Sequence, residues 1–190
     1  MHVSLCAGKN ARVTPCARYG WTVTDASKQT LYMTVLMTPD MANFSGNVHG
    51  GTILKLLDQV AYACASRYAG SYVVTLSVDR VVFREPIHVG ELVTFSASVN
   101  YTGRTSMEVG IRVETENIQR GETRHTNSCY FTMVAVGEDS KPLELTPLIP
   151  SNAVGRQRFE AARRRRDLRR ETEQREADIQ AASLHVHENT

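Results

Sequence analysis

Residues 46–60 read GNVHGGTILKLLDQV, and this stretch decides the fold. A glycine-rich approach over 46–51 leads straight into an apolar run whose hydrophobic residues recur at helical spacing as far as Tyr68. The run predicts a helix over 52–68 that is apolar around most of its circumference, which is typical of a buried helix. One carboxylate, Asp58, lies on this helix, and we expect water to be restricted around it.

The beginning of this helix offers two kinds of catalytic group. Backbone N–H groups at a helix N-terminus can stabilise a developing oxyanion. Asp58, further along, can act as a base or as a nucleophile. Each feature also has a structural interpretation: a solvated or ion-paired Asp58, a loop or core histidine at His49, and a turn or helix-cap side chain at Asn47. The residues alone leave both interpretations open.

Strand-like runs lie on both sides of the predicted helix. Residues 30–37 precede it, and the runs 71–83, 92–101, 106–117 and 124–136 follow it, each rich in Val, Ile, Thr, Phe and Tyr. Turn residues separate these runs. Such short connections require antiparallel neighbours, because parallel crossovers need a dozen or more residues. We therefore expect an α+β fold in which a strongly curved antiparallel sheet wraps one long central helix.

The order of these motifs resembles that of the hot-dog-fold acyl-CoA thioesterases, in particular the acyl-CoA hydrolase group. The similar region runs from about Thr30 to Pro150. Its motifs, in order, are MTPD (37–40), Asn43, GNVHGG (46–51), Leu57-Asp58, VTLSVD (74–79), Phe83, Pro86-Ile87, Gly90, GRTSMEV (103–109) and FTMVAV (131–136). Their occurrence together and in order carries the resemblance, which implies a hot-dog fold.

The resemblance implies roles for particular residues. Asp58 would be the catalytic carboxylate, as general base on water or as nucleophile on the thioester carbonyl. Asn47 would lie across a subunit interface from Asp58 of the partner subunit and orient the water or the carbonyl. The backbone amides of Gly50 and Gly51 would form the oxyanion site. The expected substrate contacts are His49, Thr75, Gly103, Arg104, Thr105 and Ser106.

The resemblance also implies a reaction and an assembly. The expected reaction is hydrolysis of acyl-CoA to a free fatty acid and CoA, without a metal or another cofactor. A single domain that holds both Asn47 and Asp58 implies a homodimer with two complete sites, and similar enzymes imply a homohexamer built as a trimer of dimers. Two alternatives stay open: an acyl-CoA-binding or regulatory protein without turnover, and a hot-dog dehydratase that pairs His49 with Asp58.

The 190 residues allow one domain with extensions at both ends. We assign 1–28 to an N-terminal extension without regular structure, 29–150 to the hot-dog domain and 151–190 to an Arg-rich helical tail. Formal net charge is only +2, which favours no particular partner. Opposite charges at helical spacing predict a helix over 159–180, with the last ten residues unstructured.

The tail has a structural and a functional interpretation. It contains nine arginines and seven acidic residues, which is typical of a solvated or interface helix. The cluster Arg163–Arg166 could instead contact a phosphate of CoA, of a nucleotide or of nucleic acid. Because no aromatic residue interleaves these arginines, we expect no nucleic-acid partner.

The sequence also limits where the protein acts. Residues 1–24 carry three basic and no acidic residues but lack the apolar core of a secretory signal, and no segment could span a bilayer. We expect a cytoplasmic protein without membrane insertion, with a mitochondrial transit peptide as the alternative. Cys6, Cys16, Cys64 and Cys129 lack metal-ligand spacing and predict reduced thiols.

Overall fold

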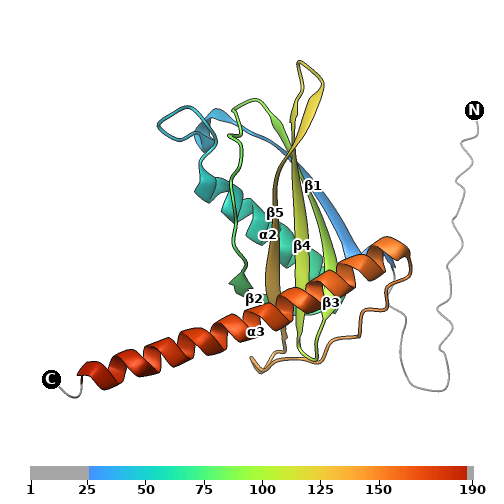
Figure 1. The fold of residues 1–190 in the computed structure, drawn as a ribbon. Helices are drawn as coiled ribbons and strands as arrows, with labels where there is room; N and C mark the ends of the chain where they lie inside the picture. The colour runs from blue at the N-terminus through green and yellow to red at the C-terminus, as the bar shows by residue number, and fades with distance from the viewer. Residues whose placement is uncertain (1–25, 188–190) are drawn as a thin grey trace, which may run out of the picture.

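The computed structural model describes residues 26–187 of the chain, and the side chains of residues 28–181. Five strands form one antiparallel sheet in the order β1-β3-β4-β5-β2 (Figure 1). The elements are α1 (Ala26–Gln29), β1 (Thr30–Leu36), η1 (Pro39–Met41), α2 (Gly50–Ala69), β2 (Tyr72–Val78), β3 (Leu92–Thr102), β4 (Ser106–Asn117), β5 (Glu122–Val136) and α3 (Ala153–His187). The predicted α+β architecture is confirmed: the sheet curves around α2, and α3 crosses its other face.

Each predicted strand and helix is present; β4 has the predicted ends, and the other predicted elements differ at one or both ends. β2 ends at Val78 instead of residue 83. The amide of Asp79 still donates to the carbonyl of Tyr130, and beyond it the chain leaves β5 as a loop. The expectation that the last ten residues lack structure was wrong for residues 181–187, because α3 continues to His187; residues 188–190 lie outside the described residues. Of the predicted N-terminal extension, residues 26–28 belong to α1. The rest of it lies outside the described residues.

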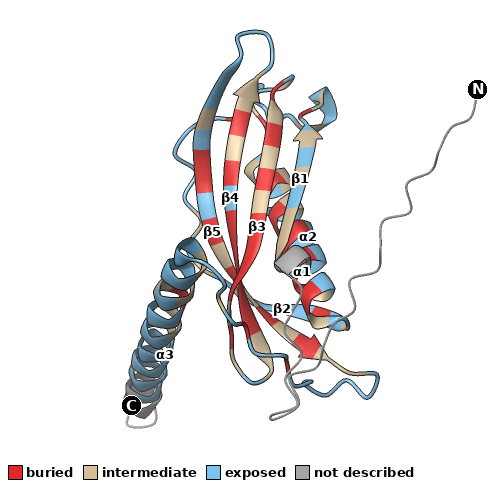
Figure 2. Cartoon of the chain, turned by 90° about the vertical axis from the view of Figure 1, so that its right-hand side faces the viewer, coloured by how far each residue is buried: buried red, intermediate tan, exposed pale blue. Residues whose placement is uncertain are grey.

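α2 buries one apolar stripe against the concave face of the sheet. The buried residues are spaced by three or four, as one helix face requires: Ile53, Leu57, Val60, Ala61, Cys64, Ala65 and Tyr68. The opposite stripe is exposed and includes Leu54, Asp58 and Tyr62 (Figure 2). The expectation of a helix buried on most sides was therefore wrong for the single chain, because the sheet covers only one side of α2.

α3 crosses the outer face of the sheet and is held there by buried charge. The side chain of Glu108 on β4 is only 1% exposed and pairs with Arg165 at 2.6 Å and Arg169 at 3.1 Å. Arg169 also reaches Asp79 at 2.8 Å. The guanidinium of Arg165 stacks 3.6 Å above the ring centre of Tyr130. These contacts tie the first half of α3 to β4 and β5, while its second half extends past the sheet (Figure 1).

The predicted phosphate-binding cluster is divided by this packing. Arg165 serves Glu108, and Arg166 donates to the hydroxyl of Tyr101 at 3.0 Å. Arg163 and Arg164 point to solvent. Nearby, Phe159 packs against the ring of Tyr101 with centroids 5.1 Å apart. The first half of α3 is therefore an interface helix within the chain, as the structural interpretation of the tail predicted.

A bulge in β2 sets which of its residues face α2. β2 pairs regularly with β5 as far as Thr75, and Leu76 is then one residue more than the ladder needs. After the bulge, Ser77 faces α3 and Val78 lies opposite the core residue Phe131. Bulges of this kind re-aim side chains. Here the bulge puts Val78 on the same face as Thr75, whose hydroxyl bonds to Asp58 of α2.

Residues 26–187 contain three α-helices and one 3₁₀ helix, α1, α2, α3 and η1. None of them combines the length and the apolar character that crossing a bilayer requires.

Candidate active site

Asp58 and Thr75 meet between α2 and β2. Oδ1 of Asp58 accepts a 2.7 Å hydrogen bond from the Thr75 hydroxyl, which also lies 3.6 Å from the sulfur of Met133. Asp58 lies on the exposed stripe of α2, so the predicted restriction of water around it is not met in the single chain. The bond holds Oδ1, while Oδ2 has no hydrogen-bond partner within residues 28–181.

A pocket of about 350 Å³ lies beside this pair. Its lining residues come from α2 and β2 and are Asp58, Gln59, Tyr62, Tyr72, Val73, Val74 and Thr75. The rings of Tyr62 and Tyr72 meet edge to face with centroids 6.1 Å apart. The size is near the lower end for small-molecule sites. Aromatic and aliphatic walls around one carboxylate suit an apolar group attached to a polar reacting centre.

The loop before α2 is folded around the side chain of Asn43. Its Oδ1 accepts from the amides of Ser45 at 2.9 Å and Asn47 at 3.2 Å. The amide of Val48 donates to the carbonyl of Ile87 at 2.8 Å, which ties the loop to the segment before β3. Within residues 28–181 the side-chain amide of Asn47 has no hydrogen-bond partner. Its backbone is fixed while its amide group is available to a ligand or another chain.

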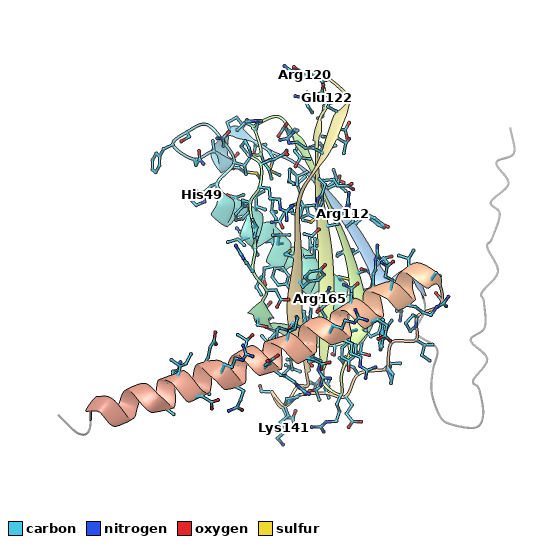
Figure 3. The ribbon with its side chains drawn as sticks, viewed as in Figure 1. His49, Arg112, Arg120, Glu122, Lys141 and Arg165 are labelled. Carbon is cyan, nitrogen blue, oxygen red and sulfur yellow. The ribbon has the colours of Figure 1, made fainter. Side chains whose placement is uncertain are left out.

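His49 caps the start of α2 (Figure 3). Its Nδ1 accepts from the amide of Gly51 at 2.9 Å, and its carbonyl accepts from the amides of Thr52 and Ile53. Gly51, one of the two predicted oxyanion donors, is thus already bonded. The amide of Gly50 is the one N–H of this first turn that has no acceptor in the described part of the chain.

Gly50 and Asp58 are eight residues apart on α2, which is about 12 Å along the helix axis. A reacting carbonyl has to lie about 3 Å from both the attacking group and the oxyanion donors. The amide of Gly50 and the carboxylate of Asp58 in one chain are too far apart to serve the same carbonyl. A site that uses both groups needs a second copy of the chain.

The predicted substrate contacts at the β3–β4 turn lie apart from this pocket. The carbonyl of Arg104 accepts from Leu145 at 2.8 Å, and that of Thr105 accepts from Ala135 at 3.1 Å. Ser106 pairs with Val134 of β5, which places the turn two strands, about 10 Å, from β2. The structure therefore brings together Asp58 and Thr75 but not the turn of residues 103–106. The role of the turn stays a prediction.

Sequence reasoning missed Glu91, which anchors the segment beside the Asn43–Asn47 loop. Burial tends to raise the pKa of Glu91, but two hydrogen bonds from Arg124, at 2.7 and 2.8 Å, and one from the His88 amide hold it below its ordinary value. Arg124 also donates to the carbonyl of Pro86. The Glu91–Arg124 pair fixes the segment that contains Ile87, whose carbonyl accepts from the amide of Val48.

Titratable groups elsewhere do not form a metal centre. Among the residues whose side chains are described, no three His, Cys, Asp or Glu are grouped so that they could hold a metal ion. Cys64 and Cys129 are free and buried in the core. Burial raises the pKa of each thiol to about 12. They are packing residues in this structure.

Known proteins with similar sequences and folds identify the family. Residues 45–122 match the thioesterase superfamily. Protein VdlD of Helicobacter pylori is 49% identical over 151 residues, 80% of this chain and 86% of VdlD. A hexameric acyl-CoA thioesterase, solved without ligand, is 34% identical with a TM-score of 0.74, over 77% of this chain and 94% of that one. The chain belongs to the thioesterase superfamily, in its acyl-CoA hydrolase group, and is a thioester hydrolase.

An acyl-CoA hydrolase from Staphylococcus aureus, solved with butyryl-CoA, CoA and CoA disulfide, gives a comparison for the site. It is 28% identical, with a TM-score of 0.74, over 83% of this chain and 96% of that one. Three variants of it have been solved, in which alanine replaces an asparagine, an aspartate or a threonine. The aspartate lies 15 positions after the asparagine, and the threonine lies 17 positions after the aspartate. Asn43, Asp58 and Thr75 have the same two separations here.

This spacing draws attention to Asn43, which sequence reasoning did not select as a site residue. Asn47 was chosen because it belongs to the glycine-rich segment next to α2. Asn43 lies four residues earlier, and a β-turn asparagine is common enough to attract no notice. The signal that could have identified Asn43 is its place in the MTPD-x-x-N sequence, which precedes the loop.

Proposed function

We propose that this protein hydrolyses acyl-CoA thioesters to a free fatty acid and CoA, and that Asp58 carries the chemistry. The observation that supports this most is the 2.7 Å bond between Thr75 and Asp58 beside an apolar pocket, in a chain of the acyl-CoA hydrolase group. With Oδ1 held by Thr75, Oδ2 is the oxygen presented to water or to the thioester carbonyl.

Two routes use the same groups. As a general base, Asp58 takes a proton from water while the water oxygen attacks the carbonyl carbon. The oxyanion then collapses, the C–S bond breaks, and the CoA thiolate leaves and takes a proton. As a nucleophile, Oδ2 forms an anhydride as the C–S bond breaks, and water then hydrolyses the anhydride. In both routes the amide of Gly50 in the partner subunit would stabilise the oxyanion.

An asparagine of the loop before α2 completes the proposed site across the subunit interface. Asn47 is the residue predicted from the sequence, and its amide group is unpaired within the described residues. Asn43 is favoured by its separation from Asp58 and Thr75. Its Oδ1 is used by the loop, so it would act through its Nδ2 as a donor to the carbonyl oxygen or to the water.

The proposed assembly is a homodimer, which forms a homohexamer as a trimer of dimers. β2 is an edge strand, and Tyr72, Val74 and Leu76 on it are exposed next to Leu54 and Tyr62 of α2. A strand edge flanked by exposed apolar side chains invites pairing. Pairing there would cover the surface around Asp58 and restrict its water. An active monomer, measured by light scattering at micromolar concentration, would contradict the assembly.

The test of the chemistry is Asp58→Asn, assayed by thiol release from acyl-CoA esters of several chain lengths. Removing a base or nucleophile costs a factor of about 10² to 10⁴ in kcat. Asp167→Asn is the matched control, because Asp167 is exposed on α3 at the other face of the sheet. Circular dichroism checks the fold of both variants. The proposal is falsified if Asp58→Asn keeps more than about a tenth of wild-type turnover.

Mixed dimers test the shared site and the choice of asparagine. Asn43→Ala and Asn47→Ala are each allowed to exchange subunits with Asp58→Asn. An exchanged dimer can hold one intact site of two, so up to about half of the activity returns for the asparagine that acts across the interface. No recovery with either variant, despite exchange shown by mass spectrometry, would remove both asparagines from a shared site.

The assay distinguishes the first alternative function, and the geometry of one chain bears on the second. A non-catalytic acyl-CoA-binding protein predicts binding without thiol release, which the same assay detects. The dehydratase alternative pairs His49 with Asp58, but these residues are nine positions apart along α2, about 13 Å on the helix axis. Nδ1 of His49 also holds the Gly51 amide. No observation within one chain favours the dehydratase.

A further inference from the structure

The outer face of the sheet is hollow beneath the first half of α3. Its floor consists of small or polar side chains in adjacent register positions of three strands: Ser96, Ser98 and Asn100 on β3, Gly110 and Arg112 on β4, Ser128 and Tyr130 on β5. One stripe of α3 forms the roof: Val154, Gln157, Arg158, Ala161 and Arg165. The space between floor and roof, here named the outer-sheet cavity, measures about 320 Å³.

Gly110 makes room in this cavity for the side chain of Asn100. A Cβ at this position would collide with Nδ2 of Asn100 and would lie 3.2 Å from the ring of Tyr130. The amide group of Asn100 therefore lies directly over the glycine. A helix that packed tightly on this face would need apolar side chains of larger volume here, and beside Arg112 and Tyr130 the floor offers Ser, Asn and Gly.

The polar groups of the cavity are donors in excess of acceptors. Asn100 is 5% exposed, and its Oδ1 accepts from the Ser98 hydroxyl at 2.8 Å. Its Nδ2 has no acceptor among the side chains and backbone of the described chain. The hydroxyls of Ser96 and Tyr130 also lack a partner in this part of the molecule.

One positive charge at the cavity has no carboxylate partner and belongs to Arg158, an exposed residue of α3. Arg165 is paired with Glu108 at 2.6 Å, and Arg112 with Glu114 at 3.0 Å. Arg158 donates only to the Ser98 hydroxyl, at 3.3 Å, and no carboxylate lines the cavity. A bound group that carries negative charge and several acceptor oxygens would satisfy both Arg158 and Asn100.

We propose that the outer-sheet cavity binds the phosphate group of a small phosphorylated molecule. Guanidinium groups recognise phosphate through paired N–H donors, and donors from β3, β5 and α3 surround the cavity from three sides, as the tetrahedral oxygens of phosphate require. The volume leaves room for a small organic group as well. The sheet separates this cavity from Asp58 of the same chain, so a molecule bound in the cavity does not touch that carboxylate.

The test is calorimetric titration of the full-length protein with inorganic phosphate at constant ionic strength. We expect saturable binding that Arg158→Gln weakens at least about tenfold, because a charge-assisted contact is lost. Arg163→Gln is the matched control: it removes the same charge from the same helix at an exposed position outside the cavity. It leaves the binding constant unchanged. Gly110→Ala, which displaces the Asn100 amide, abolishes binding, and the melting temperature shows whether this variant keeps its fold.

Two results would overturn the proposal. One is no saturable binding of phosphate to the wild-type protein. The other is equal weakening by Arg158→Gln and Arg163→Gln, which would mean that phosphate responds only to the charge of α3. A second titration, with CoA at saturation, identifies the source of the phosphate group. Unchanged binding identifies a free ligand, and competition identifies a phosphate of CoA. The titration measures binding without turnover, so its result does not depend on whether the protein hydrolyses thioesters.

Discussion

The hydroxyl of Thr75 donates a 2.7 Å hydrogen bond to Oδ1 of Asp58, and this bond links the edge strand β2 to the central helix α2. Asp58 is otherwise exposed on its helix, so the bond is the contact that orients its carboxylate. Thr75 directly precedes the β2 bulge. The geometry of the candidate catalytic group therefore depends on the register of an edge strand.

Replacing Thr75 by Val keeps the shape of the side chain and removes the bond. A hydrogen bond to a charged group contributes about 1.5–3 kcal/mol, so we expect kcat to fall roughly 10- to 100-fold while KM changes less. Thr75→Ser restores the donor and should restore most of the rate. A Thr75→Val enzyme within about twofold of wild type would show that the bond does not orient the reacting carboxylate.

Glu91 makes the fold sensitive to acid. Its pKa in the folded protein lies below the ordinary value of 4.5, so its stabilisation is complete above that value and is lost as pH falls through the lower one. Glu91→Gln should lower the free energy of unfolding by about 1–3 kcal/mol at pH 7 and flatten its dependence on pH below 4.5. Urea unfolding across this range measures both effects. Glu144→Gln, at an exposed site, is the control and should change neither.

The buried thiols should resist alkylation in the folded protein. Burial raises the pKa of Cys64 and Cys129 to about 12, so at pH 8 almost none of either is thiolate, the reactive form. Iodoacetamide should modify both only after unfolding in urea, as followed by peptide mass mapping. Rapid labelling of the Cys64 peptide under native conditions would contradict its burial against the sheet.

Arg169 tests whether α3 stabilises the fold without serving the reaction. Arg169→Ala leaves Asp79 without its partner and removes one of two arginines from Glu108, which should lower the free energy of unfolding by about 1–3 kcal/mol. Because α3 lies across the sheet from Asp58, kcat should stay within about threefold of wild type. Arg170→Ala changes an exposed neighbour and should affect neither quantity. A large loss of kcat in Arg169→Ala would place α3 in the reaction.

The elements of the domain could be predicted because local patterns determine them. Val109, Ile111 and Val113 alternate with residues of the other face, and the apolar stripe of α2 recurs at helical spacing. The position of Asp58 on that helix followed from the same spacing. Its exposure did not, because it depends on how far the sheet curves around α2.

The outer face could not be predicted because it depends on pairs far apart in the chain. Arg165 and Glu108 are 57 positions apart, and neither residue type signals a buried contact. From the sequence, the arginines of the tail were therefore interpreted as solvated or as phosphate-binding residues. The alternation of Ser96, Ser98 and Asn100 was a visible signal that one face of β3 is polar. The sequence did not show that α3 covers that face, so the cavity between them could not be predicted.

At the β2 bulge the strand can lose one residue while the side chains on both sides of the bulge stay on the same faces of the sheet. Deleting Leu76 would regularise the ladder and leave Thr75 and Val78 on the side of α2. Deleting Val74 instead would shift the alternation before the bulge and turn Thr75 away from Asp58. Single-residue gaps among functional relatives of this protein are therefore expected just after the threonine and not before it.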